Sequence, residues 1–311
     1  MATTIDALWQ LDRTRETATR PRWIERVSGI TPAEFAERYR DTRRPVILTD
    51  ALRGWPALER FTPEFFRSEY GDRIVRVRGR ERRLDDIITM QMASTAAAPA
   101  PYPCTLFDCR GLLDDVTPRF PCSLPSRHAS RLVPPRVFEN VNHLELFFGG
   151  PGGQFPYLHY DMLHMHSWIA QVHGEKEFTF FEPGQEHLFY VHPDMPWISM
   201  ADDLDDVSRF PLLQQARREK VVVRQGEALF IPAGTWHTAR SLGMTVTVAF
   251  DQLEGSNWRE FARDVADMDR RSGHRWRALA TRAWLGAAGT LLGLAERFGA
   301  NRAGNWPSLP R

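Results

Sequence analysis

The sequence predicts a mainly β protein with flanking helices, in which a mixed α/β segment precedes an antiparallel sandwich or barrel. Three observations lead to this fold class. Between about residues 137 and 253, short apolar segments are separated by Gly and Pro turns at hairpin spacing. Before residue 94, segments of helical periodicity alternate with short β-rich runs. After Gly255 the apolar residues return to helical spacing.

Composition narrows the class of protein. The chain has 311 residues, of which 42% are hydrophobic, so it is long enough to bury a sizeable core. A formal net charge of +1 gives no reason to expect nucleic acid as a partner. The Arg-rich segment 73–83 is a local exception, and its apolar positions favour an exposed strand edge over a recognition patch. The three cysteines, Cys104, Cys109 and Cys122, form no CxxC pair and no apolar signal peptide precedes them, so we expect a reduced, cytoplasmic protein.

The N-terminal third contains both helices and strands. Residues 1–22 are polar and weakly periodic, and we expect them to form a flexible arm. Thr31-Pro32 and Thr62-Pro63 are start signals for two helices. The elements expected here are helices over 31–42, 62–71 and 84–93 and strands over 44–50 and 74–79. Residues 94–140 are Pro-rich, with short helical pieces such as 110–116, and the pattern does not order them further.

The predicted barrel consists of eight short segments. They cover residues 142–150, 155–161, 167–174, 176–183, 219–226, 227–234, 236–242 and 244–252. A long polar insertion, residues 192–218, interrupts them, and it either covers the mouth of the barrel or runs over the surface.

The C-terminal region, residues 256–311, is predicted to be helical, with Ser256 or Asn257 as the first cap. Its apolar run 283–295 is shorter than the roughly 20 residues that span a bilayer, so no membrane anchor is expected. Gly289 and Gly293 lie at helical spacing and allow close helix packing. This favours docking onto the sheet or a homodimer contact.

Potential metal ligands lie in the predicted barrel. His159 and Asp161 are two residues apart in LHYD, so an extended backbone points both side chains to one face. His237 follows a predicted strand and a Pro-containing turn, where it is well placed to add a third ligand. Two histidines and one carboxylate leave three positions open on an octahedral metal, which suits Fe(II) and oxygen chemistry better than a closed zinc site. A lone H-x-D pair is a weak signal, because such pairs also occur in turns that hold no metal.

Lys176 is one of only two lysines in the chain and follows the turn at Gly174. If the strand containing Ser167 faces the cavity, the returning strand faces it with Lys176 and Phe178. A lysine buried in an apolar barrel needs an anion, because its burial costs several kcal/mol. Two alternatives stay open from the residues alone: Lys176 binds a dicarboxylate, or it reaches the rim and pairs with a neighbouring glutamate.

The motifs LHYD, AQVHGEK, FEP, GEALFIPAGTWH and TVTVAF, in this order, resemble those of JmjC and cupin-like 2-oxoglutarate-dependent oxygenases. The similarity is greatest to the group that includes the asparaginyl hydroxylase of hypoxia-inducible factor, and it covers roughly residues 24–252. It implies a double-stranded β-helix (jelly roll or cupin fold) and Fe(II) held by His159, Asp161 and His237. It also implies that Lys176 pairs with the distal carboxylate of 2-oxoglutarate. The expected organisation is an arm (1–22), a catalytic domain (23–255, barrel core about 137–253) and a helical region (256–311).

Several residues depart from the pattern of that group. Pro156 stands where relatives often carry Thr, and Ala249 stands where they carry a late Asn. Ser167 takes the place of another Asn once two extra residues in MLHMH are allowed for. We assign Ser167 and Tyr102 to the co-substrate site, and the departures leave the pose of 2-oxoglutarate open.

The two extra residues bring His164 and His166 near the site. Two interpretations stay open: either histidine replaces a ligand or contacts substrate, or both are neighbouring loop groups, which is the interpretation we favour. The sequence therefore predicts a dioxygenase that uses Fe(II), 2-oxoglutarate and O2 and releases succinate and CO2. Its substrate would be a C–H of a protein or peptide side chain or of a small metabolite. The alternative is a cupin-fold metal- or ligand-binding protein without oxygenase activity. No nucleic acid and no membrane are expected as partners.

Overall fold

A computed structural model of the chain describes residues 23–106, 112–116 and 144–297. The expected arm, residues 1–22, lies outside the described residues, as do Cys109 and Cys122.

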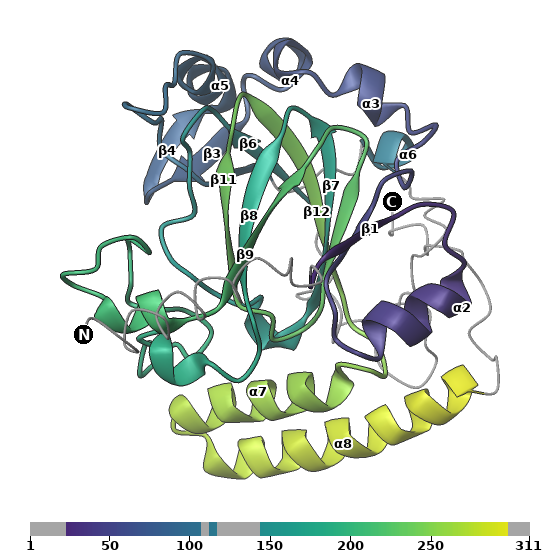
Figure 1. Cartoon of the computed structure of the whole chain (residues 1–311). Coiled ribbons are helices and arrows are strands. Elements are labelled where there is room, and N and C mark those ends of the chain that lie inside the picture. The colour runs from purple at the N-terminus through teal and green to yellow at the C-terminus, as the bar shows by residue number, and fades with distance from the viewer. Residues whose placement is uncertain (1–22, 107–111, 117–143, 298–311) are drawn as a thin grey trace, which may run out of the picture.

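Two facing β-sheets form the centre of the protein (Figure 1). The larger sheet has seven strands in the order β1-β2-β10-β7-β12-β6-β5, and the smaller has three in the order β11-β8-β9. The bounds are β1 Glu25–Val27, β2 Val46–Leu48, β5 Cys104–Leu106, β6 Leu144–Gly149, β7 His166–His173, β8 Lys176–Phe181, β9 Arg218–Val223, β10 Ala228–Ile231, β11 His237–Ser241 and β12 Thr245–Gln252. All pairs within these sheets are antiparallel except β1 with β2. The mainly β class with a jelly-roll core is confirmed.

Successive side chains along the strands of the larger sheet point to opposite faces, and the two faces contribute to two different cores. In β10, Ala228 and Phe230 join an outer core, whereas Leu229 and Ile231 join an inner core between the sheets. The outer core includes Phe35 and also collects apolar side chains from the other N-terminal helices. Because both faces of the sheet are covered, its strands are apolar on both sides.

The N-terminal helices begin at the residues that carry the predicted caps. Thr31 and Glu34 form a capping box at α2 (Pro32–Phe35), which continues as a π-helical turn over Ala36–Arg40. Thr62 accepts a hydrogen bond from the Phe65 amide at the start of α4 (Pro63–Glu69). The remaining elements here are α3 Ala57–Arg60, α5 Leu84–Met92, α6 Leu113–Val116, and a hairpin of β3 Ile74–Val77 with β4 Arg80–Arg83.

The Arg-rich segment forms this hairpin, with Val75 and Val77 buried and the four residues of β4 exposed, as the strand-edge interpretation predicts.

The insertion between β8 and β9 packs against the barrel. Within residues 192–218, Leu204, Phe210 and Leu213 form an apolar cluster with Leu158 and Trp236, so the insertion is not a loose surface excursion.

Two long helices, α7 (Trp258–Arg271) and α8 (Arg275–Arg297), lie side by side at one end of the barrel (Figure 1). Trp258, Phe261 and Leu285 pack there with Met165 and Leu253 of the barrel region. Among the helices in the described part of the chain, none is long and apolar enough to cross a membrane.

Candidate metal and co-substrate site

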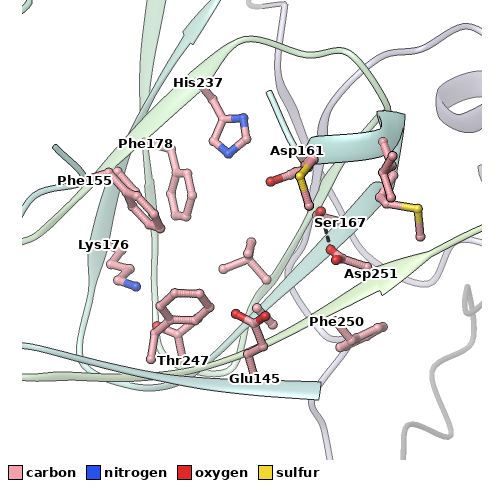
Figure 2. A pocket seen from close by; sticks show the side chains of 17 residues that line it. Glu145, Phe155, Asp161, Ser167, Lys176, Phe178, His237, Thr247, Phe250 and Asp251 are labelled. Carbon is pink, nitrogen blue, oxygen red and sulfur yellow. Dashed lines mark hydrogen bonds between the residues drawn. The ribbon is translucent and has the colours of Figure 1, made fainter. Parts of the chain in front are cut away.

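A cavity of about 380 Å³ lies between the two sheets. Its apolar walls include Phe147, Phe155, Phe178 and Phe250, and its polar side chains come from five different strands and the segment before β7. Figure 2 shows these side chains converging on a common space, with His237 and Asp161 on one side of it and Lys176 on another.

The three predicted metal ligands come together. His159, Asp161 and His237 each offer a ligand atom, and these atoms lie within 4.8 Å of one another. His159 Nε2 is 3.9 Å from Asp161 Oδ1, and the two histidine rings have centroids 4.5 Å apart. The structure thus assembles residues that are up to 78 positions apart in the sequence into one potential metal site.

The backbone around these residues differs from the predicted strand over 155–161. His159 forms isolated bridges instead, and its amide and carbonyl exchange hydrogen bonds with those of His237 at 3.0 and 2.7 Å. On the other side, the Tyr160 amide donates to the Trp197 carbonyl, and the Ser199 amide donates to the Leu158 carbonyl. The expectation of a continuous strand was wrong, because partners from two other segments fix this stretch residue by residue.

Electrostatics leave both histidines ready to bind a cation. The Nδ1–H of His237 donates to the Thr235 carbonyl at 2.9 Å, so in the neutral imidazole the lone pair is on Nε2. Burial, together with the neighbouring His237, lowers the pKa of His159 to about 3. His159 is therefore neutral at ordinary pH and has a lone pair to offer to a metal.

Asp161 supplies the test of whether a metal fits. Its Oδ2 is buried and has no hydrogen-bond partner among the described residues, which is costly for a carboxylate oxygen. Two imidazole nitrogens and one carboxylate oxygen match the donor set of non-haem Fe(II) sites with open positions. The residues present fit an Fe(II) ion.

Lys176, at the start of β8, points into the same cavity and is only 2% exposed. Its Nζ donates to the Tyr102 hydroxyl at 2.7 Å and lies 5.1 and 5.4 Å from the ring centroids of Tyr102 and Phe147. Burial lowers the pKa of Lys176 to about 7. The alternative in which this lysine reaches the rim is wrong; at the surface Glu177 pairs with Arg240 at 2.8 Å instead.

The structure places the other two predicted co-substrate residues differently. Tyr102 is 1% exposed and reaches the site through Lys176. Ser167 lines the cavity, but its hydroxyl donates to Asp251 Oδ1 at 2.9 Å.

Neither His164 nor His166 is among the residues that line the cavity. Their imidazoles meet acceptors near or on α7: His164 Nδ1 lies 2.6 Å from Asp264, and His166 Nε2 lies 2.8 Å from Ser256 Oγ. Neither belongs to the group of potential metal ligands.

Two acidic residues of the cavity were not predicted from the sequence. Glu145 of β6 and Asp251 of β12 both line it, on the wall away from Lys176 (Figure 2). Burial, together with nearby Asp161, raises the pKa of Glu145 to about 7 and also raises the pKa of Asp251. Ala249 stands directly opposite Glu145 in the sheet, and its small side chain leaves this wall open. The signal that could have found Glu145 is a lone carboxylate inside the apolar run LELFFG.

Comparison with known proteins agrees with the resemblance found in the sequence motifs. The family described as the cupin-like domain matches residues 111–251. The 2-oxoglutarate and iron-dependent oxygenase JMJD4 of Gallus gallus is 30% identical over 119 residues, which are 38% of this chain and 28% of the relative.

Two longer matches come from Arabidopsis thaliana. The arginine-specific demethylase JMJ22 is 24% identical over 270 residues, covering 76% of this chain and 48% of the relative. The lysine-specific demethylase JMJ30 is 26% identical over 250 residues, covering 73% of this chain and 54% of the relative. The chain spans about half the length, or less, of these curated relatives.

Proposed function

We propose that the chain is an Fe(II)- and 2-oxoglutarate-dependent oxygenase of the JmjC type, because residues 111–251 match the cupin-like domain and because the oxygenase JMJD4 and the demethylase JMJ22 are similar to it. One observation carries the proposal: a potential His-Asp-His metal site and a buried lysine share one cavity. The metal would occupy one side of this space and the lysine would meet an anion on the other (Figure 2).

The residues of the chain have separate tasks in this proposal. His159, Asp161 and His237 would hold Fe(II) and leave three positions open. The bound iron, with 2-oxoglutarate and O2, would supply oxidative decarboxylation to succinate and CO2 coupled to oxidation of a substrate C–H. Lys176 would bind the distal carboxylate, with Tyr102 at 2.7 Å from its ammonium. The rings of Phe155 and Phe178, which line the cavity, would limit the access of water to the space between metal and lysine.

Two measurements test the proposal. Anaerobic addition of Fe(II) and 2-oxoglutarate should produce a weak visible charge-transfer band, and aerobic incubation should release succinate. His237→Ala should lose both signals because it removes one ligand. Binding of metal and 2-oxoglutarate without succinate release, across peptide and small-metabolite pools, would favour the cupin-fold binding protein instead.

For the substrate, we propose a protein, peptide or small molecule with a basic group. Glu145 and Asp251 leave the wall of the cavity acidic, and hydrogen bonds from the described residues reach Asp251 only through Ser167. A guanidinium or ammonium group would compensate both carboxylates, which are otherwise costly to bury. Two relatives are named as arginine-specific and lysine-specific demethylases, which supports this class of substrate.

Succinate release should therefore respond to Arg- or Lys-containing peptides and small cationic amines more than to neutral analogues. Glu145→Gln and Asp251→Asn should raise KM for the responding cation by about tenfold and leave the anaerobic charge-transfer band in place. Equal responses to charged and neutral compounds would contradict the substrate class while leaving the oxygenase intact.

Two further properties belong to this proposal. An exposed apolar stripe on α8, with Trp276 85% and Leu279 61% exposed, supports a homodimer through the C-terminal helices. Light scattering of Trp276→Glu against the wild type tests it, and equal masses would refute it.

A cytoplasmic location is proposed from the odd number of cysteines and the buried free thiol of Cys104, and cell fractionation tests it.

A further inference from the structure

The short loop that follows Asp161 has an unusual backbone. Leu163 and His164 both have positive φ, +63° and +49°, in a single turn over Met162–His164. Non-glycine residues pay about 1–2 kcal/mol each in this region, so surrounding contacts must hold them there. The loop begins at a predicted metal ligand, so whatever holds it also fixes the direction of Asp161.

The His164 imidazole connects this loop to both segments that carry the predicted ligands. Its ring lies 4.6 Å, centroid to centroid, from Tyr160, which stands between His159 and Asp161. On another side it lies against Gly234 in the turn before His237, where a Cβ would come within 3.2 Å of His164 Cδ2. Gly234 has φ of +77°, so glycine suits both its backbone and its neighbour.

The C-terminal helix α7 fixes the position of His164. The Nδ1–H of His164 donates to Asp264 Oδ2 at 2.6 Å, a short charge-assisted contact between groups that are only 16% and 20% exposed. Asn257, the residue before α7, donates through Nδ2 to the His164 carbonyl at 3.0 Å. Leu163 packs on the apolar cluster that α7 and α8 form with Met165. Side chain, backbone and apolar contacts thus all tie the loop to the C-terminal helices.

We propose that His164 and Asp264 are a positioning pair through which the helical hairpin α7–α8 holds the metal-binding segments in register. The pair would touch neither metal nor substrate; it would act by holding Tyr160 and the Gly234 turn at fixed distances from the Asp161 loop. The proposal rests on the proposed metal site. It assigns a role to the enlarged loop MLHMH, which the oxygenase chemistry itself leaves without one.

Cobalt binding to the full-length protein tests the pair without catalysis. The dissociation constant and the d–d absorption of Co(II) are measured for the wild type, Asp264→Ala, Asp264→Asn and Asp267→Asn. Asp267 is the matched control, because it also lies on α7 but pairs with Arg270 at 3.1 Å.

We expect Asp264→Ala to weaken Co(II) binding by about tenfold and to change the d–d spectrum, since partners that orient ligands affect affinity on this scale. Asp264→Asn keeps an acceptor for His164 and should stay within about threefold of the wild type. Asp267→Asn should not differ from the wild type. Wild-type affinity and spectrum in Asp264→Ala would overturn the proposal, as would an equal loss in Asp267→Asn.

A second variant keeps the test decisive if Asp264→Ala does not fold. His164→Asn removes the imidazole and retains a residue that tolerates the left-handed region, so the loop backbone is preserved. The same tenfold loss is expected, and wild-type binding would overturn the proposal. His237→Ala separates the two levels of inference: if it binds Co(II) as tightly as the wild type, the metal site itself is misassigned.

Discussion

Replacing Lys176 by methionine should stabilise the metal-free protein and greatly weaken its binding of 2-oxoglutarate. Methionine retains most of the apolar stem and removes the charge. Lys176 is 2% exposed, and its hydrogen-bond partner among the described residues is a neutral hydroxyl, that of Tyr102. The buried ammonium is therefore a source of instability until an anion binds.

The magnitude follows from the pKa of Lys176, which burial lowers from 10.5 to about 7. Such a shift corresponds to at most about 5 kcal/mol of penalty on the charged form. The mutation leaves the Tyr102 hydroxyl without its hydrogen-bond partner, which reduces the gain in the free energy of unfolding by about 1–3 kcal/mol. We expect a net gain of about 2 kcal/mol at pH 7, or about 5 °C in Tm. The unfolded state binds more protons between pH 7 and 10.5, so the penalty is complete below pH 7 and fades as pH rises to 10.5.

Binding of 2-oxoglutarate should weaken at least about 100-fold in this variant, because the distal carboxylate would lose its cation inside the cavity. Calorimetric unfolding of the metal-free protein and anaerobic titration of the Co(II) form measure the two effects. Lys220→Met is the matched control, since the other lysine is exposed on β9, with Nζ 3.9 Å from Glu177. A variant at position 176 that is less stable than the wild type, or that binds 2-oxoglutarate within tenfold of it, would refute the reasoning.

Three further outcomes follow from the structure. Affinity for 2-oxoglutarate should fall about fivefold between pH 7 and 8, because Lys176 in the free protein loses its proton near pH 7; calorimetry at both pH values measures this, and a flat profile would contradict it. In the wild type, Co(II) should raise Tm and EDTA should reverse the rise, whereas the Tm of Asp161→Asn should not respond to Co(II); scanning fluorimetry measures both proteins. An equal response in the variant would exclude Asp161 as a ligand. Gly174→Ala should lower the free energy of unfolding by about 3 kcal/mol, because its Cβ would lie 2.1 Å from the Met244 carbonyl oxygen. Gly226→Ala shares a positive φ but has open space, so urea denaturation should show a loss of only about 1 kcal/mol there, and equal losses would show that contact is irrelevant.

The site shows why some of its residues could not be found in the sequence. β6 and β12 lie in a sheet that is covered by an outer core on one face and lines the cavity on the other, so apolar residues occupy both faces. The alternation that would mark Glu145 and Asp251 as inward-facing is therefore hidden. The segment around His159 was misjudged for a related reason: its extended residues pair through isolated bridges whose partners lie at positions 198 and 237.

The sequence by itself determined the local features of this protein. Proline after Thr31 and Thr62 set the helix starts, and the turns set the strand limits. The residue types at 159, 161, 176 and 237 indicated a metal site and a lysine that binds an anion. Only the tertiary structure decided which of these groups meet. His159 and His237, Lys176 and Tyr102, and His164 and Asp264 are 78, 74 and 100 positions apart. Periodicity and capping act over a few residues, whereas strand register and helix packing bring such distant side chains together.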